Sequence, residues 1–137
     1  MDCYVCVDDR GGMLFHGRRQ SRDRAVRADL LRDVQGKRLW VSPYTLGQFA
    51  PEEHSLLTVD PCFLAKAGWG ECCFVEDQPL RPWLERIGRL TLYRWNRVYP
   101  ADLSLGFSPG EAGWTLENTA EFPGYSHPTI TKEVYVR

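Results

Sequence analysis

The sequence has no apolar run long enough to cross a membrane, and its first ten residues, MDCYVCVDDR, lack a basic segment followed by a hydrophobic core. We therefore expect no contact with a membrane and a cytoplasmic location. HxH and HExxH motifs, paired C-x-x-C motifs, a P-loop and a G-x-S-x-G turn are also missing. Because the three histidines lie far apart, we predict no metal site, and metallo-hydrolase or nuclease chemistry is not supported.

Cysteine is present in an odd number, and the five cysteines lie in apolar surroundings: Cys3, Cys6, Cys62, Cys72 and Cys73. Cys3 and Cys6 form one C-x-x-C motif, but in a strand-like run, where residues three apart point to opposite faces. A zinc site or a redox pair would require a turn there. The pattern favours buried free thiols in a reducing compartment.

The 137 residues are enough for one domain with its own core, and the apolar and charged fractions, 43% and 26%, are those of a globular protein. The net charge of −1 does not indicate a partner and does not favour nucleic acid. The distribution of charge is more informative, because the basic residues are mostly arginine and crowd between Arg18 and Arg32.

The stretch from Gly17 to Gly36 contains the clearest helix pattern of the chain. Ser21 or Asp23 can cap its start, and Gly36 stands where a left-handed residue after the helix is expected. One apolar stripe follows at helical spacing: Val26, Leu30, Leu31 and Val34. Four arginines gather at the start of this helix, where its free N–H groups already carry partial positive charge: Arg18, Arg19, Arg22 and Arg24. An anion at that position would relieve the repulsion.

Strands and short helices alternate along most of the chain. We predict strands at residues 2–8, 37–42, 56–59, 71–77, 89–96, 114–122 and 130–137. Further helices are expected at residues 43–49, 62–67 and 80–87, with a loop at 13–15, a polar link at 51–55 and no regular structure at 99–113. Short crossovers between buried strands require a mostly parallel sheet, and the last two strands form an antiparallel pair at one edge.

The C-terminal third, RLTLYRWNRVYPADLSLGF followed by a Trp-Thr-Leu strand and KEVYVR, resembles the end of dihydrofolate reductases. Asp102 matches a loop aspartate of that family, Trp114 a strand tryptophan, and Glu133–Tyr135 the closing strand. The N-terminal CVDDRGGMLFHGRR resembles the family's first strand and following loop more loosely. The resemblance implies a single, shortened dihydrofolate reductase-like domain over residues 1–137, an α/β three-layer sandwich.

The resemblance also implies site residues, which this chain keeps incompletely. Asp23 is the nearest match to the carboxylate that holds the pterin and is the candidate catalytic residue, although it can equally be a helix-terminal residue that satisfies the dipole. The family's Gly-Arg-x-Thr turn, which takes cofactor phosphates, reads Ser-Pro-Tyr-Thr here and keeps only Thr45. Glu76 and Asp77 replace its Gly-Gly pair, and Tyr93 replaces its threonine. The NADPH motifs are therefore degraded, and no cofactor is predicted.

Arg94 interrupts an otherwise apolar strand face. A buried arginine requires a carboxylate, and Glu76 or Asp77 could supply it. Such an ion pair and a ligand-binding role remain equally open for these residues. Several aromatic residues, Tyr125 among them, could form a stacking platform for a base if they were exposed beside the arginines.

The leading hypothesis is a non-catalytic or altered relative that binds an anionic small molecule, such as a nucleotide, through the arginine-rich helix start, with Asp23 as an orienting group. One alternative is an oxidoreductase that uses NADPH through a rearranged phosphate site, so whether the protein is an enzyme stays open. A second alternative is an RNA- or protein-interaction module. The arginines could also form only a solvated helix face, or pair with Glu76 and Asp77 and close the cleft.

Overall fold

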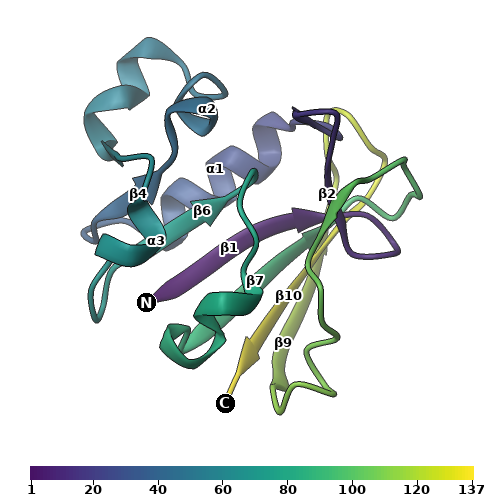
Figure 1. Ribbon diagram of the computed structural model, residues 1–137. Coiled ribbons are helices and arrows are strands. Elements are labelled where there is room, and N and C mark those ends of the chain that lie inside the picture. Colours follow the sequence, from purple (N-terminus) through teal and green to yellow (C-terminus); the bar gives the residue numbers. More distant parts are fainter.

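A seven-stranded sheet runs through the centre of the molecule, which the computed structural model describes from Met1 to Arg137 (Figure 1). Its strands are β1 (Asp2–Val7), β4 (Leu39–Val41), β5 (Leu57–Val59), β6 (Cys72–Val75), β7 (Arg89–Arg94), β9 (Thr115–Phe122) and β10 (Ile130–Val136). They follow the order β5-β4-β6-β1-β7-β10-β9. The first five strands in this order are parallel, whereas β10 is antiparallel to β7 and β9 is antiparallel to β10. The predicted sheet is confirmed, including its antiparallel C-terminal edge.

A second, smaller sheet packs beside the first. It has the order β3-β2-β8 and consists of β2 (Gly12–Phe15), β3 (Arg18–Arg19) and β8 (Leu103–Ser104). Two expectations are wrong here, because residues 13–15 form a strand and residues 99–113 contain a short one. The β2–β3 hairpin turns through His16, at φ 49°, and Gly17, at φ 73°. The arginine-rich segment therefore begins as a hairpin and becomes helical only later.

The helices are shorter than the sequence pattern indicates. The α-helices are α1 (Arg24–Asp33), α2 (Pro43–Leu46) and α3 (Phe63–Lys66), and the 3-10 helices are η1 (Pro51–Leu56) and η2 (Arg81–Arg86). A helix lies within residues 80–87 as expected, although it is a 3-10 helix, whereas the expectation of a mere polar link at 51–55 is wrong because that segment is also a 3-10 helix. Asp23 and Ser42 are the N-caps of α1 and α2, and Gly36 adopts φ 81° as expected.

Two apolar cores lie on opposite faces of the large sheet and make the predicted three layers. On one face α1 buries Val26, Leu30 and Val34 against alternate strand residues that include Tyr4 and Phe74. Fully burying a leucine such as Leu30 stabilises the fold by roughly 1.5–3 kcal/mol. The other core joins α3 and η2 to the remaining strand residues and to the small sheet.

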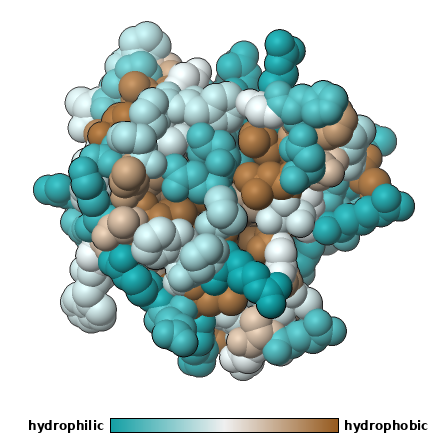
Figure 2. All heavy atoms as spheres, in the orientation of Figure 1, coloured by the Kyte–Doolittle hydropathy of each residue, from teal (hydrophilic) through white to brown (hydrophobic).

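All five cysteines are free, and four of them are buried or half-buried within the strands. Cys62 is exposed, so the expectation of a buried thiol is wrong for that residue. Cys3 and Cys6 point to opposite faces of the sheet, as expected for residues three apart in a strand. No helix is long and apolar enough to cross a membrane. On the face seen in Figure 2, hydrophilic side chains predominate, and the hydrophobic atoms form separate patches.

Candidate anion-binding site

The arginine-rich segment lies at the edge of the sheet where the parallel strands end. Strand β1 ends at this edge and is followed there by the β2–β3 hairpin. Helix α1 then begins at the same edge and runs back along one face of the sheet (Figure 1). Ligands of open α/β sheets bind at such an edge. The four predicted arginines do not form one cluster, however, because they line two separate cavities.

The first cavity, called the arginine cavity below, has a volume of about 560 Å³ and lies at the start of α1. Three arginines line it, together with residues that follow α2 and residues of the β9–β10 turn: Arg22, Arg24, Arg27, Gly47, Gln48, Phe49, Ala50, Tyr125 and Ser126. The Arg24 guanidinium lies 5.0 Å from the centre of the Tyr125 ring, within the range of a cation–π contact. Guanidinium groups and an aromatic ring therefore share one opening.

The positive charge of the arginine cavity is not neutralised by the protein. Arg22, Arg24 and Arg27 make no ion pair, and Nη1 of Arg27 is buried without a hydrogen-bond partner. The first turn of α1 contains no acidic residue, and the one carboxylate at its start, the N-cap Asp23, is engaged by the N–H of Ala25 rather than by these arginines. This arrangement favours an anion.

Asp23 is the carboxylate closest in sequence to these arginines, yet it points into the protein and is only 2% exposed. One oxygen accepts the N–H of Ala25 at 2.8 Å, and the other accepts the N–H groups of Tyr125 and Ser126 at 2.8 and 2.6 Å and the Ser126 hydroxyl at 2.7 Å. Burial alone would raise the pKa of Asp23, but these hydrogen bonds hold it below its ordinary value. Asp23 thus caps α1 and fastens the β9–β10 turn to it. Its predicted catalytic role stays a prediction.

The contacts that join the β9–β10 turn to α1 continue from Ser126 to the side chains of His127, Tyr99 and Trp95. Because the Ser126 hydroxyl donates to Asp23, its oxygen accepts from Nδ1 of His127 at 2.7 Å. This tautomer leaves Nε2 of His127 to accept from the Tyr99 hydroxyl at 2.6 Å. Trp95 stacks on the imidazole at 4.8 Å, and burial together with Arg97 lowers the pKa of His127. The chain of hydrogen bonds fixes one wall of the arginine cavity.

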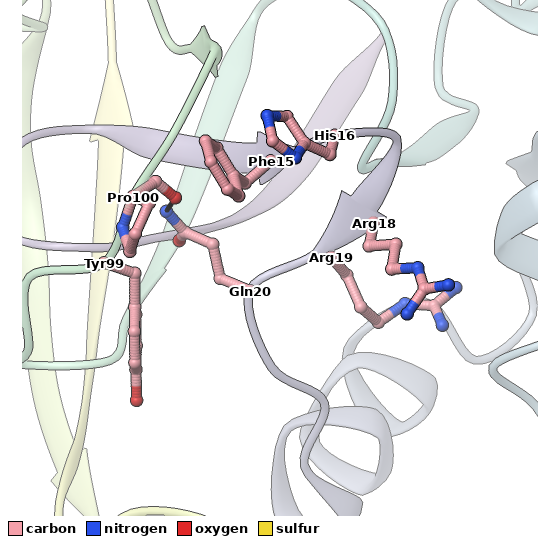
Figure 3. Close-up of a pocket in the computed structure, with 7 residues that line it drawn as sticks. All are labelled: Phe15, His16, Arg18, Arg19, Gln20, Tyr99 and Pro100. Carbon is pink, nitrogen blue, oxygen red and sulfur yellow. Dashed lines mark hydrogen bonds between the residues drawn. The ribbon is translucent and has the colours of Figure 1, made fainter.

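The second cavity, called the hairpin cavity below, has a volume of about 500 Å³ and lies between the β2–β3 hairpin and the segment after β7 (Figure 3). Its lining residues are Phe15, His16, Arg18, Arg19, Gln20, Tyr99 and Pro100. The Phe15 and His16 rings stack at 3.8 Å. In Figure 3 the guanidinium groups of Arg18 and Arg19 turn away from Tyr99 and Pro100. The aliphatic parts of Arg18 and Arg19 therefore line the hairpin cavity, whereas their charged groups do not point toward Tyr99 and Pro100.

Arg19 is occupied by an internal ion pair with Glu76. Its Nε lies 2.9 Å and its Nη2 3.2 Å from the two carboxylate oxygens, and its guanidinium lies over the Tyr44 ring at 4.4 Å. Gln48 donates a further hydrogen bond to Glu76 at 2.7 Å. Burial raises the pKa of Glu76, and its bonds to Arg19 and Thr45 offset this only in part. The predicted pairing of one helix-start arginine with Glu76 is thus present, and it fills the space at the end of β6.

The other predicted site residues lie outside both cavities. Thr45 is fully buried and accepts a hydrogen bond from Ser42, and Asp77 is half-buried, with one oxygen unpartnered. Tyr93 is buried in the core and donates to Asp29 at 2.6 Å. The expected pairing of Arg94 with Glu76 or Asp77 is wrong, because Arg94 pairs with Glu133 on the adjacent strand β10.

The sequence pattern did not identify two residues of the arginine cavity as part of a site, Arg27 and Tyr125. Arg27 lies three residues after Arg24, so helical spacing alone places both on one face and could have identified it. Tyr125 was noted only among the aromatic residues. It is about a hundred positions away in the chain, and no local pattern indicates that its turn closes over α1.

The positions that the family resemblance assigns to cofactor phosphates do not fit a dinucleotide. Glu76 is a buried carboxylate, only 6% exposed, and Arg19 already neutralises it. Thr45 is inaccessible to a ligand, and α2 begins with Pro43, which has no N–H to offer. His, Cys, Asp and Glu side chains form no group of three or more that could hold a metal ion.

Comparison with known proteins gives a structural likeness without a close sequence relative. No family model and no curated protein matches the chain. Among solved structures, the dihydrofolate reductase from Enterococcus faecalis, complexed with NADP(H) and RAB-propyl, is similar at a TM-score of 0.69 and 12% identity. The match covers 99% of this chain and 95% of that one. The chain therefore has a dihydrofolate reductase-like fold.

Proposed function

We propose that this protein binds an anionic small molecule, of which a nucleoside phosphate fits best, in the arginine cavity. The proposal rests on one observation: three arginines without a carboxylate partner surround an opening at a helix start. Free guanidinium groups in this setting repel one another unless an anion lies between them. The binding site is thus the start of α1, and the hairpin cavity is not part of it.

The chemistry of the lining residues favours a phosphate with an attached ring. Each guanidinium can form two parallel hydrogen bonds to phosphate or carboxylate oxygens. The Tyr125 ring, 74% exposed, offers a flat surface on which a base can stack. A volume of about 560 Å³ lies within the range of small-molecule sites.

NADPH-dependent reduction is the weaker alternative. It requires room for a pyrophosphate near the end of β6, where the Arg19–Glu76 pair lies. It also requires an available carboxylate, whereas four hydrogen bonds already engage Asp23. We therefore infer a binding protein rather than a reductase. Five free thiols suit a reducing compartment, so we place it in the cytoplasm.

The test is ligand-dependent thermal stabilisation by inorganic phosphate, nucleoside monophosphates and NADPH. The variant Arg24→Ser/Arg27→Ser removes two charges of the cavity, and we expect it to weaken binding of a monophosphate by about 10- to 100-fold. Arg38→Ser/Arg89→Ser is the matched control, because both arginines form half-exposed ion pairs at the opposite edge of the sheet. The proposal is wrong if no phosphorylated compound stabilises the protein, or if both double variants bind equally well.

A further inference from the structure

Six arginines of this chain make neither an ion pair nor a side-chain hydrogen bond, and their side chains are free to bind something else. They are Arg10, Arg18, Arg22, Arg24, Arg27 and Arg97. The other eight all contact carboxylates or backbone carbonyl groups of the protein. Unpaired cations mark the part of a surface that attracts anions.

The six free arginines all come from segments at one edge of the molecule, called the arginine edge below. Arg10 lies in the turn after β1 and Arg97 in the turn after β7, and these strands are parallel neighbours. The Asp9 N–H donates to the Arg97 carbonyl at 2.8 Å, which joins the two turns. The remaining four lie on the hairpin or at the start of α1. Arg10, Arg18 and Arg97 do not line the arginine cavity.

Three carboxylates of this edge face inward and do not neutralise it. Asp8 is buried and accepts the N–H groups of Arg10, Gly12 and Tyr99 and the side chain of Gln20. These hydrogen bonds lower the pKa of Asp8 although burial opposes them, so its charge is satisfied inside the protein. Asp23 and Glu76 are engaged in the same way, as described above. Of the acids in these segments only Asp9, Asp77 and Asp102 remain, half as many as the free arginines.

Exposed aromatic rings lie among these arginines. Tyr125 is 74% exposed beneath Arg24, and Phe15 is 37% exposed and stacked on His16. Aromatic side chains next to a row of cations are the usual means of binding single-stranded nucleic acid, because every base has a face that can stack. A ligand with a single phosphate in the arginine cavity would contact neither the Phe15–His16 pair nor the arginines outside that cavity.

We propose that the arginine edge binds single-stranded nucleic acid, with one phosphate in the arginine cavity and neighbouring phosphates on Arg18, Arg10 and Arg97. This rests on the proposed function, since the same cavity supplies the central contact. The net charge of −1 does not oppose it, because the charge is unevenly distributed: without the six free arginines the remaining chain carries a net charge of about −7. The rest of the surface repels the strand and thereby orients it.

The first measurement is fluorescence anisotropy with a short labelled oligothymidylate and its oligouridylate equivalent, titrated at several salt concentrations. Binding of four or more phosphates gives a slope of log Kd against log salt of about 3 or greater, since each phosphate contributes roughly 0.7. We expect the oligonucleotide to bind at least tenfold more tightly than the matching mononucleotide. Phe15→Ala should weaken oligonucleotide binding without affecting the mononucleotide.

The decisive comparison uses arginines outside the cavity. Arg10→Ser/Arg18→Ser should leave binding of a mononucleotide unchanged, weaken the oligonucleotide about tenfold and lower the salt slope, whereas Arg38→Ser/Arg89→Ser should change neither. The inference is overturned if the oligonucleotide binds no better than the mononucleotide, or if the two double variants behave alike. In both cases the small-molecule proposal survives as long as the mononucleotide still binds through Arg24 and Arg27. An acidic peptide that binds as tightly as the oligonucleotide would also overturn it.

Discussion

The ion pair between Arg19 and Glu76 affects both the packing of this fold and the space that it leaves for a ligand. The pair lies between the β2–β3 hairpin and the end of β6, and Tyr44 and Gln48 pack or bond against it. A carboxylate this deeply buried depends on its partner, because removal of one member leaves an uncompensated charge. The pair therefore has two effects: it holds the hairpin against the large sheet, and it occupies the space beside α2.

Arg19→Ala should lower the free energy of unfolding by about 3–5 kcal/mol at neutral pH. The loss should shrink on acidification. Burial already raises the pKa of Glu76, and without Arg19 it rises further, so the folded state binds the proton more tightly than the unfolded state. Stability of the variant then increases as the pH falls from about 7 toward 5. Urea denaturation at both pH values measures this, with the exposed neighbour Arg18→Ala as a control within about 0.5 kcal/mol of the parent.

Asp23 should have the opposite pH dependence. Its pKa is lowered in the folded state, so its stabilisation is complete above the unfolded value, about 3.9, and is lost as the pH falls through the folded pKa. Asp23→Asn keeps the shape but accepts fewer hydrogen bonds, and should cost about 1–3 kcal/mol at neutral pH. The difference from the parent should disappear in strong acid. A difference that stays constant with pH would show that the charge of Asp23 does not matter.

At the scale of elements, the β9–β10 turn contributes most to the site. It comes from the far end of the sequence, yet it supplies Tyr125 and Ser126 to the arginine cavity and rests on the N-cap of α1. Gly124 permits this contact, because a Cβ atom there would lie 2.8 Å from an Asp23 oxygen and 2.8 Å from the His127 carbonyl. Such a separation is shorter than atoms tolerate.

Gly124→Ala should therefore displace the turn from α1, lower stability by about 1–3 kcal/mol and weaken ligand binding in the arginine cavity. Gly110→Ala is a suitable control, since a Cβ atom at that position has no neighbour within 4 Å. Thermal denaturation and monophosphate titration of both variants measure the two effects. Equal behaviour of the two alanine variants would contradict the role assigned to the turn.

The sequence predicts the elements of this fold better than their contacts. Strand periodicity and the cap at Asp23 place the sheet and the start of α1 correctly, because these depend on neighbouring residues. The predicted lengths of the short helices are too great, because capping residues indicate where a helix begins even when tertiary packing allows only one turn. The expected partner of Arg94 is wrong because its actual partner, Glu133, is about forty positions further along the chain on β10, and no local pattern shows that β10 lies beside β7.

At the scale of the whole molecule, charge is separated although the total is close to zero. At the amino-terminal edge of the sheet the arginines form ion pairs with Glu71 and Glu117 or donate to backbone carbonyl groups, while the arginine edge leaves six of them free. The polarity follows from topology, since all parallel strands deliver their following loops to one edge. An unevenly charged molecule of this kind attracts anions to one side and repels them from the other.

A crystal structure of the protein with a nucleoside monophosphate tests the central claim most directly. We predict that the phosphate lies between Arg22, Arg24 and Arg27, that the base contacts Tyr125, and that the Arg19–Glu76 pair is unchanged. A ligand bound instead beside Glu76 and Thr45, with Arg19 released to its phosphate, would contradict the assignment of the site and would favour a rearranged reductase.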